Sequence, residues 1–256
     1  MAIKGAIKKL LSKFGYKITK DTNSNRGWSP GYLRSLSSAE IIIDIGAANG
    51  TPDLYKAFHE RKFVLFEPLI EYRHTLERRT ETLDCSMHFQ ALGNTDGETV
   101  ITIDPRRMAM SSLVERSKLT ESDSKGAQRR VKISKLDSII DGFSKPSNTL
   151  VIKIDVEGFE LEVLKGAKET LKRTDLVIVE SSIAELYVNN PNYFDVLCFM
   201  DEQGFRLLDI LDLAYYKDWP GLMWADLAFV PDRRITSTSA FMGPFRPHTG
   251  ATLPDR

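Results

Sequence analysis

Seven short runs of apolar residues recur along the middle of the chain, and polar, helix-like stretches separate most of them. These runs are IIIDIG (41–46), FVLFEP (63–68), SMHFQAL (86–92), VIKID (151–155), LVIVES (176–181), FRLLDIL (205–211) and DLAFV (226–230). Continuous apolar runs are typical of strands that are buried on both faces. Their alternation with helices predicts an α/β fold over residues 40–230, with a mostly parallel, Rossmann-like sheet of about seven strands.

Three segments depart from this rhythm. Residues 93–148 hold the turn NTDG, the probable strand ETVITID and a Ser/Arg/Lys-rich loop, and they predict an insertion over the sheet edge between the third and fourth core strands. Residues 21–39 are rich in Asn, Ser, Gly and Pro, which is typical of a linker or lid. Residues 231–256 contain four prolines among Ser, Thr and Gly, so we expect an irregular tail.

The N-terminal segment has apolar residues at positions 3, 7, 10, 11 and 14, with lysines around them. This spacing forms one stripe of a helix and predicts a basic amphipathic helix at the start of an N-terminal segment, 1–39. One interpretation is a helix docked on the domain with a solvated basic face. The other is a peripheral contact of residues 3–18 with an anionic membrane surface.

Composition narrows the class of protein. Of the 256 residues, 42% are apolar and 27% are charged, so a packed core is available. The chain has 35 basic residues (Lys plus Arg) and 35 acidic residues (Asp plus Glu). This balance provides no positive electrostatic field to attract nucleic acid, so we expect no nucleic-acid partner. The two cysteines form no C-x-x-C pair and the four histidines have no helical pairing, so no metal site of this kind is predicted. Without an apolar run of ~20 residues, we expect a soluble cytoplasmic protein.

The run IIIDIGAANG indicates a strand that turns into a helix through Gly46 and Gly50, where the backbone can approach a ligand. Glu67 ends the next strand about twenty residues later, where a carboxylate can accept ribose hydroxyls. Asp44 precedes the loop and suits a cationic ligand better than a pyrophosphate. Together these features favour S-adenosylmethionine over NAD or FAD. The alternative is that Asp44 caps the following helix and that Glu67 is simply exposed.

The motifs DIGAANG, FEP, ALGNTDG, SSL and IKIDVEGFELEVLKGA resemble the FkbM family of S-adenosylmethionine-dependent methyltransferases over about residues 40–230. The resemblance implies a class I methyltransferase sheet of seven strands with an antiparallel last strand, and methylation of hydroxyl oxygens, often on sugars. It also implies roles for particular residues. The implied cofactor contacts are Asp44, Gly46, Asn49, Gly50, Glu67, Gln90 and Ala91, and the implied acceptor contacts are Ser111 and Ser112.

The segment VIKIDVEG places a lysine in the middle of a buried strand. Side chains alternate along a strand, so Lys153 and Asp155 share a face, and Lys153 can neutralise Asp155 or Glu180. Asp155 is our first candidate for a general base and Glu157 the second, while Glu180 could fill either role or bind substrate. The alternative is a purely structural ion pair. A minority interpretation is that the three carboxylates bind a divalent cation.

The leading hypothesis is therefore an S-adenosylmethionine-dependent O-methyltransferase acting on a carbohydrate or glycan-like acceptor. A second hypothesis keeps the cofactor but has a nitrogen or small-metabolite acceptor. A third is a non-catalytic S-adenosylmethionine-binding module. A hydride-transferring dehydrogenase is the weakest, because Asp44 and the glycine spacing disfavour it.

Overall fold

The computed structural model describes residues 26–105, 108–114, 126–187, 191–216 and 219–237. The predicted basic helix at 3–18 and most of the predicted tail at 231–256 lie outside these ranges. Within them, no helix is long and apolar enough to cross a membrane.

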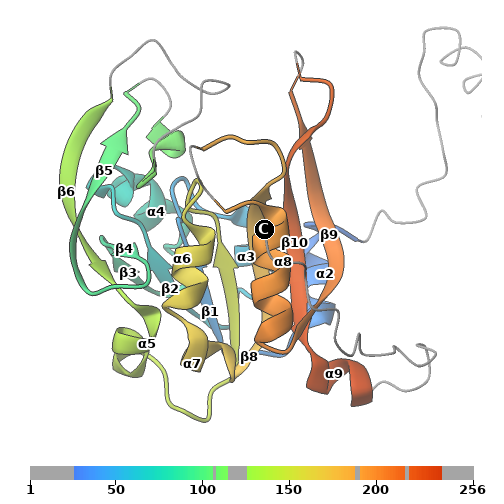
Figure 1. Cartoon of the computed structure of the whole chain (residues 1–256). Coiled ribbons are helices and arrows are strands. Elements are labelled where there is room, and N and C mark those ends of the chain that lie inside the picture. Colours follow the sequence, from blue (N-terminus) through green and yellow to red (C-terminus); the bar gives the residue numbers. More distant parts are fainter. Residues whose placement is uncertain (1–25, 106–107, 115–125, 188–190, 217–218, 238–256) are drawn as a thin grey trace, which may run out of the picture.

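A seven-stranded sheet forms the centre of the molecule (Figure 1), with the strand order β3-β2-β1-β7-β8-β10-β9. The first five strands in this order are parallel to their neighbours, and β10 is antiparallel to both β8 and β9. This arrangement confirms the class I methyltransferase fold expected from the sequence. The strands are β1 (Ile41–Ile45), β2 (Lys62–Phe66), β3 (Asp84–His88), β7 (Leu150–Ile154), β8 (Thr174–Ser182), β9 (Phe205–Tyr215) and β10 (Leu222–Pro231).

Helices cover both faces of this sheet, because each buried strand directs alternate apolar side chains to opposite sides. One face carries α2 (Pro30–Leu36), α3 (Pro52–Ala57) and α4 (Arg73–Arg79). The other carries α5 (Leu136–Ile139), α6 (Glu160–Lys165), α7 (Lys168–Leu171) and α8 (Tyr193–Glu202). Short 3-10 turns lie at Ile70–Tyr72, Met108–Met110 and Ile140–Gly142, and α9 (Asp232–Ser237) follows β10.

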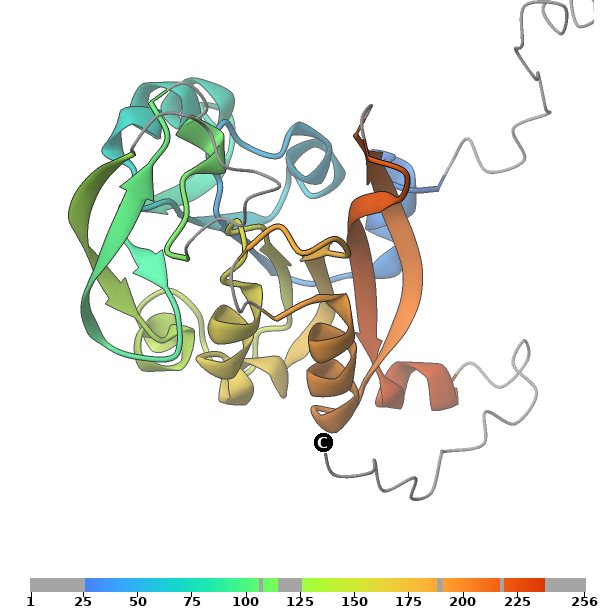
Figure 2. The same ribbon diagram turned by 45° about the horizontal axis from the view of Figure 1, so that its top comes forward.

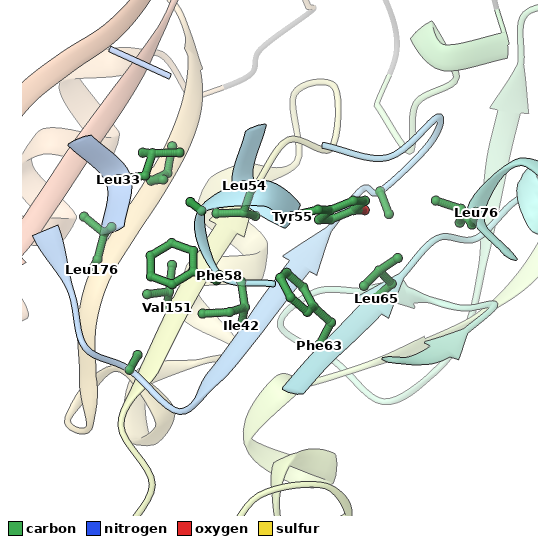
Figure 3. Close-up of a cluster of buried hydrophobic side chains, with 14 of the residues drawn as sticks. Leu33, Ile42, Leu54, Tyr55, Phe58, Phe63, Leu65, Leu76, Val151 and Leu176 are labelled. Atoms are coloured by element: carbon green, nitrogen blue, oxygen red, sulfur yellow. The ribbon is translucent and has the colours of Figure 1, made fainter. Parts of the chain in front are cut away.

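The core on the α2–α3–α4 face is drawn in Figure 3. Ile42, Val151 and Leu176 come from three neighbouring strands and pack against Leu33 and Leu54 of the helices above them. All five side chains have no exposed surface. Burying an aliphatic side chain of this size contributes about 1.5–3 kcal/mol, so this layer holds the strand ends in a fixed relative position.

Residues 30–36 differ from the expectation of a linker or lid. They form α2, a helix with proline at its first turn, and Leu33 and Leu36 are buried in the core. The Ser, Gly and Pro content that suggests a loop therefore coexists with two apolar residues three positions apart, which is the spacing of a helix face. This short helix brings the chain across the sheet next to β9 and β10.

The predicted insertion forms a small sheet of its own, with the order β4-β6-β5. Two of its strands, β5 (Gly97–Ile103) and β6 (Ala127–Ser134), lie in the predicted insertion. The third, β4 (Ala91–Leu92), comes from the end of the run 86–92, for which the sequence predicts a single core strand. Figures 1 and 2 show this sheet on the β3 side of the main sheet. Ile101 and Ile133 of the small sheet join the main core, so the insertion is anchored to the domain.

Candidate functional site

The loop that follows β1 is the first element of the site. Gly46 has a φ of +76° and Gly50 a φ of +85°, and Ala48 between them has a φ of +40°. A side chain at Gly46 would place its Cβ 1.7 Å from the backbone oxygen of Asp155. The loop packs directly against Asp155, the residue that follows β7. Position 46 therefore has no room for a side chain and requires glycine.

A pocket of about 790 Å³, including its solvent-filled mouth, lies at the carboxyl ends of the strands beside the insertion. We call it the first pocket. Eight of the residues predicted from the sequence line it: Gly46, Glu67, Gln90, Ala91, Ser111, Asp155, Glu157 and Glu180.

Glu67 is the acid at the end of β2, and only 5% of its surface is exposed. Its Oε2 accepts a hydrogen bond from the backbone N–H of Ala48 at 2.8 Å, and its Oε1 accepts one from Leu69 at 2.9 Å. Burial raises the pKa of Glu67 to about 7, although the two N–H donors favour the charged form. Glu67 thus joins the glycine loop to the chain after β2 and also presents a carboxylate to the first pocket.

The lining of the first pocket fits S-adenosylmethionine by the chemistry of its groups. A carboxylate, Glu67, can accept hydroxyl donors of a ribose, and the amide of Gln90 can both donate to and accept from a purine edge. Leu92, Ile101 and Met108 supply apolar walls of the kind that enclose a flat ring.

A second pocket of about 640 Å³ adjoins the first. The two pockets share Gly46, Ala48, Asp155 and Glu180. Of the residues predicted from the sequence, Asn49, Gly50 and Lys153 line the second pocket but not the first. Asp155 and Glu180 therefore stand where the two pockets meet.

Lys153 lies at the centre of the charged groups. Its Nζ donates a hydrogen bond of 3.0 Å to Oδ2 of Asp155 and lies 3.5 Å from Oδ1 of Asp44. Burial by itself lowers the pKa of Lys153, but the carboxylates of Asp155 and Asp44 outweigh burial and raise the pKa above its ordinary value. The buried lysine is thus paired with the acid two residues later on the same strand face, as the alternation of side chains predicts.

Asp44 is fully buried and lines neither of the two pockets. Its Oδ2 accepts hydrogen bonds from the hydroxyls of Tyr55, at 2.7 Å, and Thr51, at 3.0 Å. Because Thr51 immediately precedes α3, Asp44 ties the end of the glycine loop to β1. The structure thus places this carboxylate beneath the loop, in contact with Lys153, rather than on the wall of a pocket.

Four carboxylates surround the meeting point of the pockets. Asp226 of β10 pairs in register with Glu180 of β8, which lies two positions beyond Ile178, the partner of Lys153. Burial raises the pKa of Glu180 well above its ordinary value, and the charges of Asp155, Glu157 and Asp226 raise it further. Oxygens of Asp155, Glu157 and Glu180 lie within 4.8 Å of one another, a spacing that a divalent cation can bridge.

Glu157 has a φ of +55°, which is rare for a residue with a side chain. Ser112 from the insertion donates a hydrogen bond of 2.5 Å to its backbone oxygen, and the hydroxyl of Tyr187 donates to its Oε2. Glu160 accepts from the backbone N–H groups of Val156 and Gly158 on either side. The strained turn after β7 is therefore held by three separate segments.

The two predicted serines lie in different places. Ser111 lines the first pocket, whereas Ser112 is 3% exposed and lines neither pocket. Ser112 instead positions Glu157 through its hydroxyl. Sequence reasoning missed Trp28, Tyr187 and Asp226. An acid in the run DLAFV was a usable signal for Asp226, since a carboxylate inside an apolar strand needs a partner.

Comparison with known proteins identifies the family of the chain. The family model described as the methyltransferase FkbM domain matches residues 44–207. The methyltransferase sdnD of Sordaria araneosa is 29% identical over 165 residues, which cover 54% of this chain and 64% of that protein. The chain thus spans less than two thirds of that relative.

Two solved structures resemble this fold weakly. Precorrin-6Y C5,15-methyltransferase of Geobacter metallireducens is 7% identical with a TM-score of 0.41, and covers 77% of this chain and 82% of its own. Magnesium protoporphyrin IX methyltransferase of Synechocystis, with bound S-adenosylmethionine, is 9% identical with a TM-score of 0.39. The match covers 75% of this chain and 70% of that protein. These similarities carry no weight in the assignment, which rests on the family match over more than half of the chain. The protein belongs to the FkbM family of S-adenosylmethionine-dependent methyltransferases.

Proposed function

We propose that the protein transfers a methyl group from S-adenosylmethionine to a hydroxyl of a carbohydrate or glycan-like acceptor. The observation that supports this proposal best is the position of Asp155. It lines both pockets, and a buried lysine holds it in place. A carboxylate between a cofactor pocket and an adjoining pocket is where a hydroxyl nucleophile needs a proton acceptor.

The cofactor-binding residues in this proposal are Glu67, Gln90 and Ala91 in the first pocket, and Gly46, Asn49 and Gly50 along the loop. When bound, S-adenosylmethionine would supply a methyl group on a positively charged sulfur, and attack of a nucleophile in line on the methyl carbon would release S-adenosylhomocysteine as the leaving group. Asp44 acts indirectly, because it fixes Thr51 and Lys153 beneath the loop.

The chain's own groups then have separate tasks. Asp155 takes the proton of the acceptor hydroxyl at a carboxylate oxygen, and Lys153 fixes the orientation of that carboxylate. Glu157 and Glu180 line the same space and orient the acceptor, or act as the base in place of Asp155. Ser111 lines the first pocket and is the candidate acceptor contact from the insertion. Alignment of the two reacting groups supplies the remainder of the rate enhancement.

The experiment that tests this proposal replaces Asp155 by Asn, which keeps the shape and removes the charge. Release of S-adenosylhomocysteine is measured with methyl glycosides and, separately, with primary amines as acceptors. A positioned base contributes a factor of ~10²–10⁴, so Asp155→Asn should bind S-adenosylmethionine normally and lose turnover by about that factor. Asp141→Asn, at a carboxylate with 83% of its side chain exposed, is the matched control.

Parental turnover in Asp155→Asn would transfer the role of base to Glu157 or Glu180, or to a mechanism of alignment alone. Turnover with amines but not with glycosides would favour the nitrogen-acceptor alternative. Binding of the cofactor without any transfer would favour a non-catalytic binding module. Loss of activity in EDTA, restored by Mg²⁺, would support the cation interpretation of Asp155, Glu157 and Glu180.

The membrane contact of the basic amphipathic helix at residues 3–18 stays a prediction. If it contacts a membrane surface, the full chain should sediment with vesicles that contain phosphatidylserine, and salt should release it. A chain that lacks residues 1–25 should remain in the supernatant.

A further inference from the structure

We propose that the acceptor extends to the side of the second pocket that Trp28 and Asp226 form, and that these two residues select a pyranose ring that is neutral or positively charged there and reject an anionic one. This inference rests on the proposed function, because it takes the acceptor to be a carbohydrate. It adds the charge class of that acceptor and two residues that determine specificity.

The contact between Trp28 and Asp226 builds one side of the second pocket. The indole Nε1 of Trp28 donates a hydrogen bond of 2.6 Å to Oδ2 of Asp226, and both residues line the pocket. The backbone before Trp28 is also fixed: a Cβ at Gly27 would lie 2.8 Å from the backbone oxygen of Leu211. Trp28 is thus held by two contacts: its indole is bonded to Asp226 of β10, and the preceding Gly27 packs against Leu211 of β9.

Charge excludes one class of ligand from this pocket. Three carboxylates line it, those of Asp155, Glu180 and Asp226, and the lysine among them is already paired with Asp155 and the buried Asp44. Burial raises the pKa of Asp226 to about 6, and the charge of Asp155 also raises it, although the bond from Trp28 lowers it. Such mutual repulsion is relieved by a cation and made worse by an anion.

The same lining suits a pyranose ring. A carboxylate accepts strong hydrogen bonds from hydroxyl groups, and several converge here. Trp28 adds an aromatic surface. Its indole N–H is already bonded to Asp226, so the face of the ring is available for apolar contact with a sugar or for attraction of an amino group. Asp155, the candidate base, lies in the same pocket, so an acceptor held there has its hydroxyl near the first pocket.

Trp28 and Asp226 both lie outside residues 44–207, the part that the family model matches. The residues shared by the two pockets, such as Gly46 and Asp155, lie inside it. The specificity that we assign to Trp28 and Asp226 is therefore an inference from the contacts of this chain and is not supplied by the family match.

The test measures binding by calorimetry to the full chain saturated with S-adenosylhomocysteine. The probes are three rings that differ in charge: methyl glucoside, methyl glucosaminide and methyl glucuronide. The first two should bind and the glucuronide should bind at least roughly tenfold more weakly. Asp226→Asn should reduce this discrimination, and Trp28→Leu should weaken the glucoside roughly 3- to 10-fold while the affinity for S-adenosylhomocysteine stays unchanged.

Trp28→Phe provides a second variant that keeps an aromatic ring, in case Trp28→Leu does not fold. It should retain most of the affinity for the glucoside. If the glucuronide binds as tightly as the glucoside, or if discrimination is unchanged in Asp226→Asn, the inference is wrong while the proposed function stands. If the parental chain binds none of the three rings, the carbohydrate acceptor of the proposed function fails, and the inference fails with it.

Discussion

The hydroxyl of Ser112 donates a hydrogen bond of 2.5 Å to the backbone oxygen of Glu157, a residue 45 positions later in the chain. Ser112 follows the Met108–Met110 turn of the insertion, and Glu157 occupies the strained turn after β7. The bond therefore makes the insertion part of the support for the strained turn after β7. A strained backbone persists only where its surroundings hold it.

Ser112→Ala should release this turn. We expect a loss of about 0.5–1.5 kcal/mol in stability, because a partly buried hydrogen bond to the backbone oxygen of Glu157 is removed, together with a fall in turnover. Ser111→Ala is the matched control for stability alone, because Ser111 is itself the candidate acceptor contact; its hydroxyl has one weaker backbone contact, 3.3 Å from the nitrogen of Asp104. Thermal melting and release of S-adenosylhomocysteine measure the two effects. Equal melting temperatures for both variants would show that Ser112 does not support the turn.

Lys153→Met should be among the most damaging substitutions. It leaves Asp44 and Asp155 near the core without their cation, and breaking a buried pair in this way costs about 3–5 kcal/mol. Lys172→Met is the control, because Lys172 forms an exposed pair with Glu169 that contributes about 0–1 kcal/mol. Denaturant unfolding compares the two. A loss below about 1 kcal/mol for Lys153→Met would mean that water replaces the ammonium.

Gly46→Ala should disrupt the site from the β1 side. The added Cβ would overlap the backbone oxygen of Asp155, and the φ of +76° disfavours any side chain. Gly31→Ala in α2 is the matched control, since a Cβ added there would have no atom within 4 Å and alanine favours a helix by about 1 kcal/mol. We expect a lower melting temperature and weaker cofactor binding for Gly46→Ala only. A Gly46→Ala chain with parental stability would show that the loop can move away from β7.

The affinity for S-adenosylmethionine should rise with pH through the pKa of Glu67. That pKa is raised to about 7 by burial, and only the charged carboxylate accepts two ribose hydroxyls. About one tenth of Glu67 is ionised at pH 6 and about nine tenths at pH 8, so the affinity should increase roughly tenfold between them. Calorimetry at both values measures this change. Glu67→Gln should bind more weakly at pH 8 and should lose the pH dependence; an unchanged dependence would remove Glu67 from the cofactor site.

Stability should change in the opposite direction, mainly between pH 4.5 and about 7. Between its unfolded value of 4.5 and about 7, Glu67 holds a proton in the folded state that it has released in the unfolded state. The folded state is therefore favoured at low pH, and this contribution, on the order of 1–3 kcal/mol, is lost as pH rises through about 7. Glu160 has the same sign, since burial also raises its pKa to about 7. Glu67→Gln should flatten part of the pH dependence of unfolding; an unaltered slope would contradict the shift.

The pairing of Lys153 with Asp155 was predictable because it depends only on the alternation of side chains along one strand. The placement of Glu67 was predictable because consecutive parallel strands end at one edge of the sheet. The reason why position 46 requires glycine was not predictable. The sequence suggests that the backbone approaches a ligand there, whereas the structure shows contact with Asp155. The link between Trp28 and Asp226 spans 198 positions, and no local pattern records such a contact.

The location of Trp28 and Asp226 on either side of the family-matched region has a practical consequence for protein engineering. The residues that we propose for cofactor binding and catalysis lie within the family-matched block, and the side of the second pocket that we assign to acceptor choice is contributed by its two flanks. Chimeras that exchange only the segments around positions 28 and 226 between family members would retain the block intact. They offer a way to redirect such a catalyst to a new acceptor without rebuilding its catalytic centre.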